Sequence, residues 1–268
     1  MRWTVARGVG VWFCVGSLVS GLCGCVTTTP PSAGVPLRSP IAPFAPPLTG
    51  PVRTIVVDAG HGGHDPGTEH FGLREKQLAL DIAKRVRLSL QQAGLTIIMT
   101  RETDQFIPLN RRPGVANRLS ADLFVSVHIN ANPNPRVSGI EVYYPRESVV
   151  SSSAPWPPSV QPADVWMPSV TVKQILWDLV FSRTRFHSRR LASAICHAMR
   201  EELQAPCRTV KPARFVVLRE AWMPAVLVEV GYVTNESEAS RLGSEAYREA
   251  AARAIARGIL TYIREVGG

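Results

Sequence analysis

Three apolar runs in this sequence lead directly into ionisable residues. The first leads into Asp58 and His61, the second into His128, and the third into Glu229. Runs rich in valine, isoleucine and leucine predict buried strands, and open α/β sheets collect their sites where parallel strands end. Burying such groups unpaired is costly, whereas a divalent cation compensates a carboxylate and accepts a neutral imidazole nitrogen. We therefore expect these groups to converge on a metal ion.

Each histidine also has an ordinary interpretation. His61 is flanked by glycines, which allow close approaches that a side chain would block, but it could also be an exposed loop histidine. His128 could be a hydrogen-bonded residue at a strand end. His64 and His70 lie in the same loop as His61. We expect both to be exposed, with His64 the alternative ligand if His61 has no metal role.

Glu75 directly precedes a strong helical pattern. An acidic residue there can simply complement the helix dipole. As a third ligand it would instead complete a set of two histidines and one glutamate. Such a set leaves one position open for water, as catalytic zinc sites require.

Glu229 interrupts the apolar segment 224–232. A carboxylate beside a metal can take a proton from attacking water and return it to a departing amine, so we expect Glu229 to act as general base and then general acid. The alternative is a salt bridge to an arginine or another buried partner.

Eight blocks of the sequence carry a family resemblance over residues 53–264. They are residues 56–63 (Val-Val-Asp-Ala-Gly-His-Gly-Gly), 74–76 (Arg-Glu-Lys), 99–101 (Met-Thr-Arg), 108–109 with Arg112, 126–132 (Ser-Val-His-Ile-Asn-Ala-Asn), 139–143 (Gly-Ile-Glu-Val-Tyr), 210–213 (Val-Lys-Pro-Ala) and 228–232 (Val-Glu-Val-Gly-Tyr). In this order, the blocks resemble the zinc-dependent N-acetylmuramoyl-L-alanine amidases of the cell-separation type.

The resemblance implies a reaction and its residues. One zinc ion per chain would be held by His61, Glu75 and His128, with Glu229 as the catalytic carboxylate. The substrate would be peptidoglycan, cleaved at the amide between the lactyl group of N-acetylmuramic acid and L-alanine of the stem peptide. Asn130 and Glu141 would orient the ligands or the substrate, and Asp58 would hydrogen-bond His61 or cap the loop.

The pattern between these residues predicts an α/β fold in one domain. We expect a mixed, mostly parallel sheet of about six strands, covered by helices on both faces. The expected strands cover 54–58, 96–99, 123–127, 139–144, 214–218 and 225–230. The expected helices cover 76–92, 109–119, 172–179, 188–203 and 244–264.

The N-terminal region predicts export and lipidation. Residues 1–24 combine Arg2 and Arg7 with a short apolar stretch, as in a signal peptide. Leu22-Cys23-Gly24-Cys25 resembles a bacterial lipobox, which makes Cys25 the expected lipidation site. Residues 25–51 would be a lipidated cysteine and proline-rich tether, and 52–268 the catalytic domain. The expected location is the periplasmic face of the cell envelope, as a membrane-anchored lipoprotein.

Charge and cysteine content narrow the class of partner. Without Arg2 and Arg7, the chain has 28 basic and 21 acidic residues, a net charge of +7. An exported chain without a basic run or interleaved aromatics is a poor candidate for binding nucleic acid, so cell-wall carboxylates or an anionic membrane are favoured. An exported chain could form a disulfide between Cys196 and Cys207, but nothing in the sequence indicates one, and we expect Cys196 to pack as a small hydrophobe.

Residues 146–169 are rich in proline and serine and predict a surface excursion. Regulated members of the family carry an inhibitory helix in this region, but the prolines leave no run long enough to form one. We therefore expect activity without an activator protein. Two other functions remain open: a zinc peptidase acting within the stem peptide, and a catalytically silent wall-binding lipoprotein.

Overall fold

The computed structural model describes residues 51–146 and 170–267. The predicted leader, Cys25 and nearly all of the tether lie outside the described residues, as does nearly all of the proline-rich segment 146–169. No helix within the described ranges is long and apolar enough to cross a membrane.

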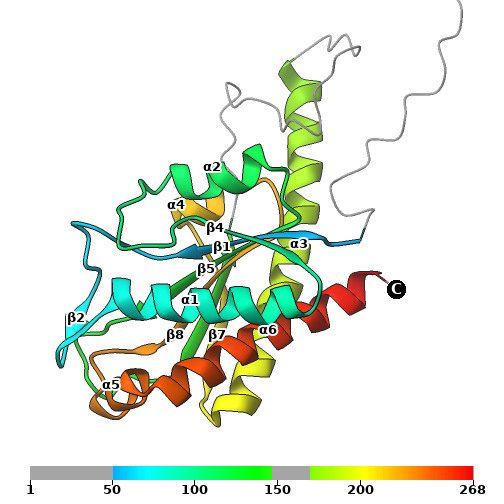
Figure 1. The fold of residues 1–268 in the computed structure, drawn as a ribbon. Helices are drawn as coiled ribbons and strands as arrows, with labels where there is room; N and C mark the ends of the chain where they lie inside the picture. Colours follow the sequence, from blue (N-terminus) through cyan, green and yellow to red (C-terminus); the bar gives the residue numbers. More distant parts are fainter. Residues whose placement is uncertain (1–50, 147–169, 268) are drawn as a thin grey trace, which may run out of the picture. The chain divides into compact units, whose positions relative to one another are not determined.

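A six-stranded sheet forms the centre of the fold, in the order β4-β1-β5-β8-β6-β7 (Figure 1). Four strands run parallel: β1 (Thr54–Ala59), β4 (Thr96–Met99), β5 (Leu123–Asn130) and β8 (Ala225–Tyr232). Strand β6 (Ile140–Pro145) is antiparallel to β8, and β7 (Cys207–Ala213) is parallel to β6. The predicted mixed, mostly parallel sheet is confirmed.

Helices cover both faces of this sheet, as predicted. One face carries α1 (Glu75–Gln92), α3 (Val170–Leu203) and α6 (Glu245–Gly267), which share the larger hydrophobic core. The other carries α2 (Arg111–Arg118) and α4 (Val216–Arg219) over a smaller core. The remaining elements are a short hairpin, β2 (Glu69–His70) and β3 (Leu73–Arg74), and the helix α5 (Glu236–Gly243).

The central strands are apolar throughout because both of their faces are buried. In β1, Ile55 and Val57 point into the larger core, whereas Val56 points into the smaller one. Strand β5 divides in the same way, with Val125 on one side and Phe124 on the other. This alternation is the ordinary period of a strand between two layers of helices.

The helices expected over 172–179 and 188–203 are one helix, α3. No proline or glycine occurs between Val170 and Ala205, so nothing in the sequence ends a helix there. Thr184, between the two predicted pieces, and Ser188, at the start of the second, continue its buried face.

The strand expected over 214–218 was wrong. The sixth strand is β7, which pairs with β6, and residues Val216–Arg219 form α4. Val217 and Leu218 are apolar because they pack into the smaller core, not because they extend a sheet. Strand β7 lies at the edge, which accounts for its polar composition and for Pro212 within it.

Cys196 and Cys207 form a disulfide, contrary to the sequence-based preference for a free Cys196. Their Cα atoms lie 5.8 Å apart. The bond joins α3 to the start of β7 across the turn that contains Pro206. Only the close return of the chain after α3 brings these two thiols together.

Candidate metal centre

Three elements bring His61, Glu75 and His128 together. His61 follows β1, Glu75 is the first residue of α1, and His128 lies near the end of β5, the strand beside β1. His61 has a φ of 58°, in the left-handed region that is rare for non-glycine residues. Backbone strain of this kind often accompanies functional positions.

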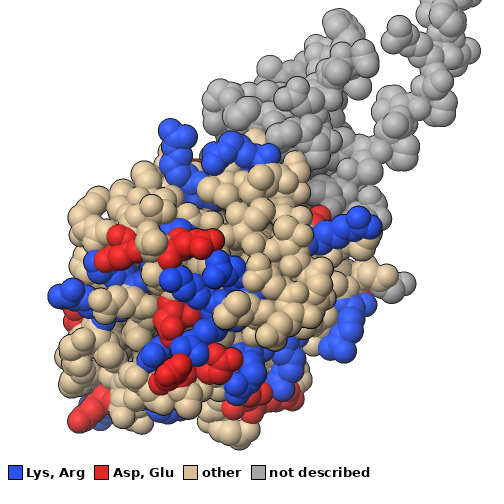
Figure 2. All heavy atoms as spheres, viewed as in Figure 1, with Lys and Arg blue, Asp and Glu red and all other residues tan. Residues whose placement is uncertain are grey.

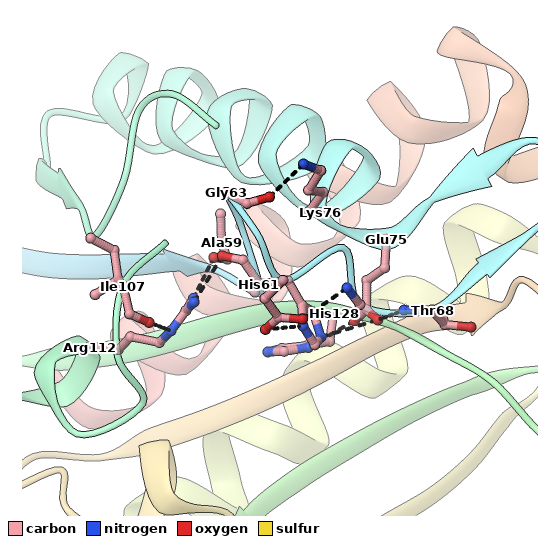
Figure 3. Close-up of polar contacts among 12 residues, drawn as sticks. Ala59, His61, Gly63, Thr68, Glu75, Lys76, Ile107, Arg112 and His128 are labelled. Carbon is pink, nitrogen blue, oxygen red and sulfur yellow. Dashed lines mark hydrogen bonds and ion pairs between the residues drawn. The ribbon is translucent and has the colours of Figure 1, made fainter. Parts of the chain in front are cut away.

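The three side chains face one another across a short distance (Figure 3). One potential ligand atom from each lies within 4.8 Å of the others. The Nε2 atom of His61 is 3.2 Å from Oε2 of Glu75, and Nδ1 of His128 is 2.9 Å from Oε1. Glu75 is buried, whereas both histidines are partly exposed. This arrangement could hold a metal ion that remains reachable from solvent.

Backbone donors and a second carboxylate fix the directions of these ligands. The carboxylate of Glu75 accepts hydrogen bonds from the backbone N–H groups of Thr68 (2.9 Å) and Ile129 (3.0 Å). Asp65 Oδ2 lies 2.8 Å from Nδ1 of His61, which leaves Nε2 turned towards Glu75. A carboxylate behind a ligating histidine sets its tautomer and raises its basicity. Asp65 was missed in the sequence, although it stands four residues after His61.

Two glycines make room for the site. A Cβ atom at Gly60 would lie 2.4 Å from Cε1 of His128. A Cβ at Gly67 would lie 2.5 Å from Oε2 of Glu75 and 2.8 Å from Cδ2 of His61, and Gly67 has a positive φ. Gly60, one of the glycines that flank His61, therefore allows a close approach as the sequence suggested, and Gly67 allows another.

Buried arginines hold the loop that carries His61. Arg112 donates to the carbonyls of Ala59 (2.7 Å) and His61 (2.8 Å) (Figure 3). Arg101 donates to the carbonyls of Ala59 (2.9 Å) and Gly60 (2.6 Å). Both side chains are buried, so these bonds fix the loop strongly. Their role was not foreseen, although both lie within the family blocks.

Asp58 supports this loop indirectly. Its carboxylate accepts from the hydroxyls of Thr100 (2.6 Å) and Ser126 (2.7 Å) and from Arg112 (3.1 Å). No bond between Asp58 and His61 occurs among the described residues. The expected hydrogen bond to His61 is replaced by a path through Arg112, because Asp58 points into the buried sheet.

Glu229 lies beside the ligands with one oxygen unsatisfied. It is the neighbour of His128 in the parallel pairing of β5 with β8. Its Oε2 atom is buried and has no hydrogen-bond partner among the described residues. Burial, together with the negative charges of Glu75 and Glu141, raises the pKa of the Glu229 carboxyl well above its ordinary value. The salt bridge that was the alternative role for Glu229 does not occur among the described residues.

Glu141 faces Glu229 across the antiparallel pairing of β6 with β8. It accepts hydrogen bonds from the hydroxyl of Tyr143 and from Nδ2 of Asn130 (3.2 Å). Lys211 on β7 places its Nζ atom 4.0 Å from the Glu141 carboxylate. Asn130 and Glu141 therefore contact each other, and Glu141 lies beside Glu229.

His64 and His70 are exposed, as expected. Their rings pack against Phe106 and Phe71, with centroids 4.1 Å and 4.5 Å apart. Neither belongs to the group that could hold a metal ion within the described residues.

Comparison with known proteins identifies the family. The family model of N-acetylmuramoyl-L-alanine amidases (Amidase_3) matches residues 55–261, which include every residue of the centre. The chain belongs to this amidase family. Its activity is therefore that of a peptidoglycan hydrolase, an N-acetylmuramoyl-L-alanine amidase, and the predicted membership in the N-acetylmuramoyl-L-alanine amidases is confirmed.

Curated relatives and solved structures agree with this family assignment. AmiA of Escherichia coli K12 is 36% identical over 223 residues, covering 80% of this chain and 77% of that protein. The structure of AmiC2 of Nostoc punctiforme is 34% identical with a TM-score of 0.62, covering 79% of this chain and 97% of that one. An amidase structure from Clostridium difficile 630 has 29% identity and a TM-score of 0.64, with coverages of 80% and 98%.

Proposed function

We propose that this amidase is zinc-dependent, with His61, Glu75 and His128 as the ligands of one zinc ion and Glu229 as the catalytic base. The observation that carries the proposal is the buried, unpartnered oxygen of Glu229 beside a two-histidine, one-glutamate set. A buried carboxylate oxygen without a donor is costly to keep in a fold. It is explained if the atom receives a proton during the reaction.

The ligand set fits a catalytic zinc ion. Zinc takes imidazole nitrogen and carboxylate oxygen, and catalytic sites use three protein ligands and keep a fourth position open. The partial exposure of both histidines leaves access for water and substrate. Asp65 supplies the outer carboxylate that such histidines commonly require.

The reaction follows from the roles of these side chains. When bound, zinc supplies a Lewis acid that polarises a carbonyl and lowers the pKa of water to about 7. Glu229 takes a proton from the attacking water as the water oxygen bonds to the lactyl carbonyl carbon. The carbon–nitrogen bond then breaks, and Glu229 returns the proton to the amino group of L-alanine. A zinc ion held by His61, Glu75 and His128 would offset the negative charge of Glu75 and favour the ionised form of Glu229 that this requires.

Metal dependence is tested by removal and restoration. Exhaustive chelation should abolish hydrolysis of purified sacculi, and added zinc should restore it. Elemental analysis of the active protein should give one zinc per chain. Full activity in protein shown to contain no metal would contradict the proposal.

The bond cleaved is tested by mass spectrometry of the products. An amidase releases intact stem peptides that begin with L-alanine and leaves the sugar strands otherwise unmodified. Trimmed stem peptides would show a peptidase instead, and the absence of products from zinc-loaded protein would show a wall-binding protein.

We propose further that the chain is a lipoprotein with a signal peptide over 1–24, lipidated at Cys25 and held at the periplasmic face of a membrane by the tether 25–51. The lipobox and the proline-rich composition support this. Cys25→Ala should release the protein from washed membranes, whereas the wild type should stay, because several acyl chains anchor stably. Equal release of both would contradict lipidation.

We propose that no activator protein is required, because the prolines of 146–169 oppose an inhibitory helix. Purified protein covering 52–268 should cleave sacculi unaided. Deleting residues 149–164 should raise the rate less than about tenfold, or ~1.4 kcal/mol of barrier. A folded, zinc-loaded protein that stays inert until this deletion would reveal an inhibitory element.

A further inference from the structure

One side of α3 presents arginines and large apolar side chains to solvent. Helical spacing places these residues together, away from the buried face formed by Thr184, Ser188 and Leu191. Leu179 is 62% exposed and Phe186 is 59% exposed, and three arginines stand beside them. We name this surface the α3 stripe, formed by Leu179, Arg183, Arg185, Phe186 and Arg189.

The α3 stripe carries three arginines and contains no acidic residue. No acidic residue occurs between Leu179 and Arg200. Among the described residues, none forms an ion pair with Arg183, Arg185 or Arg189. The helices α1 and α6 differ, because there Arg85 contacts Asp81 and Glu245. Figure 2 shows Lys and Arg interspersed with Asp and Glu over that face.

Among the described residues, the acidic groups near α3 contact basic residues at the border of the stripe. Glu265 of α6 contacts Arg190 at 3.1 Å, and Glu201 contacts His197 at 3.4 Å and Arg257 at 3.8 Å. A groove of about 560 Å³ runs between α3 and α6 here, with Phe186 and Arg189 in its wall. The first part of the stripe, from Leu179 to Arg185, comes before these ion pairs along α3.

The stripe lies at the edge of the sheet where the parallel strands begin, opposite the metal centre. The Oγ atom of Ser188 accepts from the backbone N–H of Ala225 (2.9 Å), which begins β8. Strands β1, β5 and β8 are parallel, so Thr54 at the start of β1 lies at this edge too. Figure 1 shows α3 extending beyond this edge of the sheet. The metal centre, by contrast, lies where β1 and β5 end.

We propose that the α3 stripe docks on an anionic phospholipid bilayer and turns the metal centre away from it. Arginines attract the negative surface of such a membrane, and exposed Phe and Leu side chains among them enter the boundary between headgroups and acyl chains. Charge complementarity favours this occupant, since the stripe joins uncompensated arginines to apolar groups that a purely polar wall polymer would leave in water. The chain enters the domain at the same edge, at Thr54.

The test is sedimentation of the unlipidated chain with vesicles. Protein covering residues 26–268 lacks the apolar leader and Cys25, so neither lipidation nor zinc is needed for the result. It should bind vesicles of phosphatidylcholine with 30% phosphatidylglycerol (roughly a strongly anionic leaflet) and lose binding in high salt. It should not bind phosphatidylcholine alone.

A triple variant, Arg183→Gln with Arg185→Gln and Arg189→Gln, should bind at least tenfold more weakly, because each arginine near an anionic surface contributes about fivefold. The matched control removes three exposed arginines near the opposite edge, Arg111→Gln, Arg136→Gln and Arg208→Gln, and should bind like the wild type. Both variants should keep wild-type hydrolysis of sacculi, which shows that they are folded.

Three results would overturn the proposal. The wild type could fail to bind anionic vesicles. The two triple variants could lose binding equally, which would show a general effect of net charge. The α3 variant could keep vesicle binding but lose binding to purified sacculi, which would make the stripe a wall-binding surface.

Discussion

The two halves of the metal centre satisfy their buried polar atoms differently. In the half built from β1, α1 and β5, the Glu75 carboxylate meets two backbone N–H groups and two imidazoles. In the half built from β8 and β6, Glu229 keeps an oxygen without a partner. The hydrogen bonds to Glu75 fix that carboxylate in place without a metal, whereas the free oxygen of Glu229 can accept a proton. Under the proposed function, this difference separates the residues that hold the metal from the residue that moves the proton.

The largest expected effect follows from removing the free oxygen's basicity. Glu229→Gln keeps the shape of the side chain but cannot take a proton. We expect kcat to fall about a hundredfold or more while zinc content is unchanged. Rates on soluble muropeptides and elemental analysis check this. Glu236→Gln, an exposed carboxylate after β8, is the control and should be neutral. A wild-type rate for Glu229→Gln would place the base elsewhere.

The next effect tests the metal-holding half. Asp65→Asn weakens the support behind His61 Nδ1, 2.8 Å away. We expect zinc affinity to fall about 10- to 100-fold, with activity restored by excess zinc. Competition with a chromogenic chelator measures this affinity. Asp122→Asn, which caps the start of β1 at the far edge, should leave it unchanged. Unaltered affinity in Asp65→Asn would exclude Asp65 from the site.

A smaller loss should follow from filling space beside His128. Gly60→Ala would place a methyl group 2.4 Å from the imidazole, so the ring or the loop must shift. Overpacking typically costs 1 to 3 kcal/mol, so we expect zinc affinity to fall about tenfold. Gly114→Ala, whose Cβ would meet its nearest atom only at 3.5 Å, is the matched control. Equal zinc affinity in both variants would show that the ring is not confined.

The smallest effect on turnover should come from the disulfide. Replacing Cys196 and Cys207 with Ser should lower the free energy of unfolding by about 3 kcal/mol, the usual contribution of a bond closing a short loop. The kcat should stay at the wild-type value, because the bond ties α3 to β7 and not to the ligands. Denaturant unfolding and initial rates test the two statements separately. A large loss of kcat with the fold intact would link β7 and Lys211 to catalysis.

The sequence by itself determined the features that are local in the chain. Apolar strands ending in His61, His128 and Glu229 were recognisable because burial on both faces fixes the composition of a strand. The carboxyl ends of parallel strands lie at one edge, so convergence of these residues could be expected.

Only the tertiary structure decided which distant groups meet. Asp65, not Asp58, supports His61, because Asp58 points into the sheet towards Thr100 and Ser126. Cys196 and Cys207 are bonded because the chain turns back after α3, and β7, not the apolar run at residues 214–218, forms the sixth strand. Glu229 keeps a free oxygen because no donor on the surrounding strands reaches it. The contacts of Asp58, the pairing of β7 and the free oxygen of Glu229 depend on the packing of segments far apart in the sequence, and local composition carries no record of that packing.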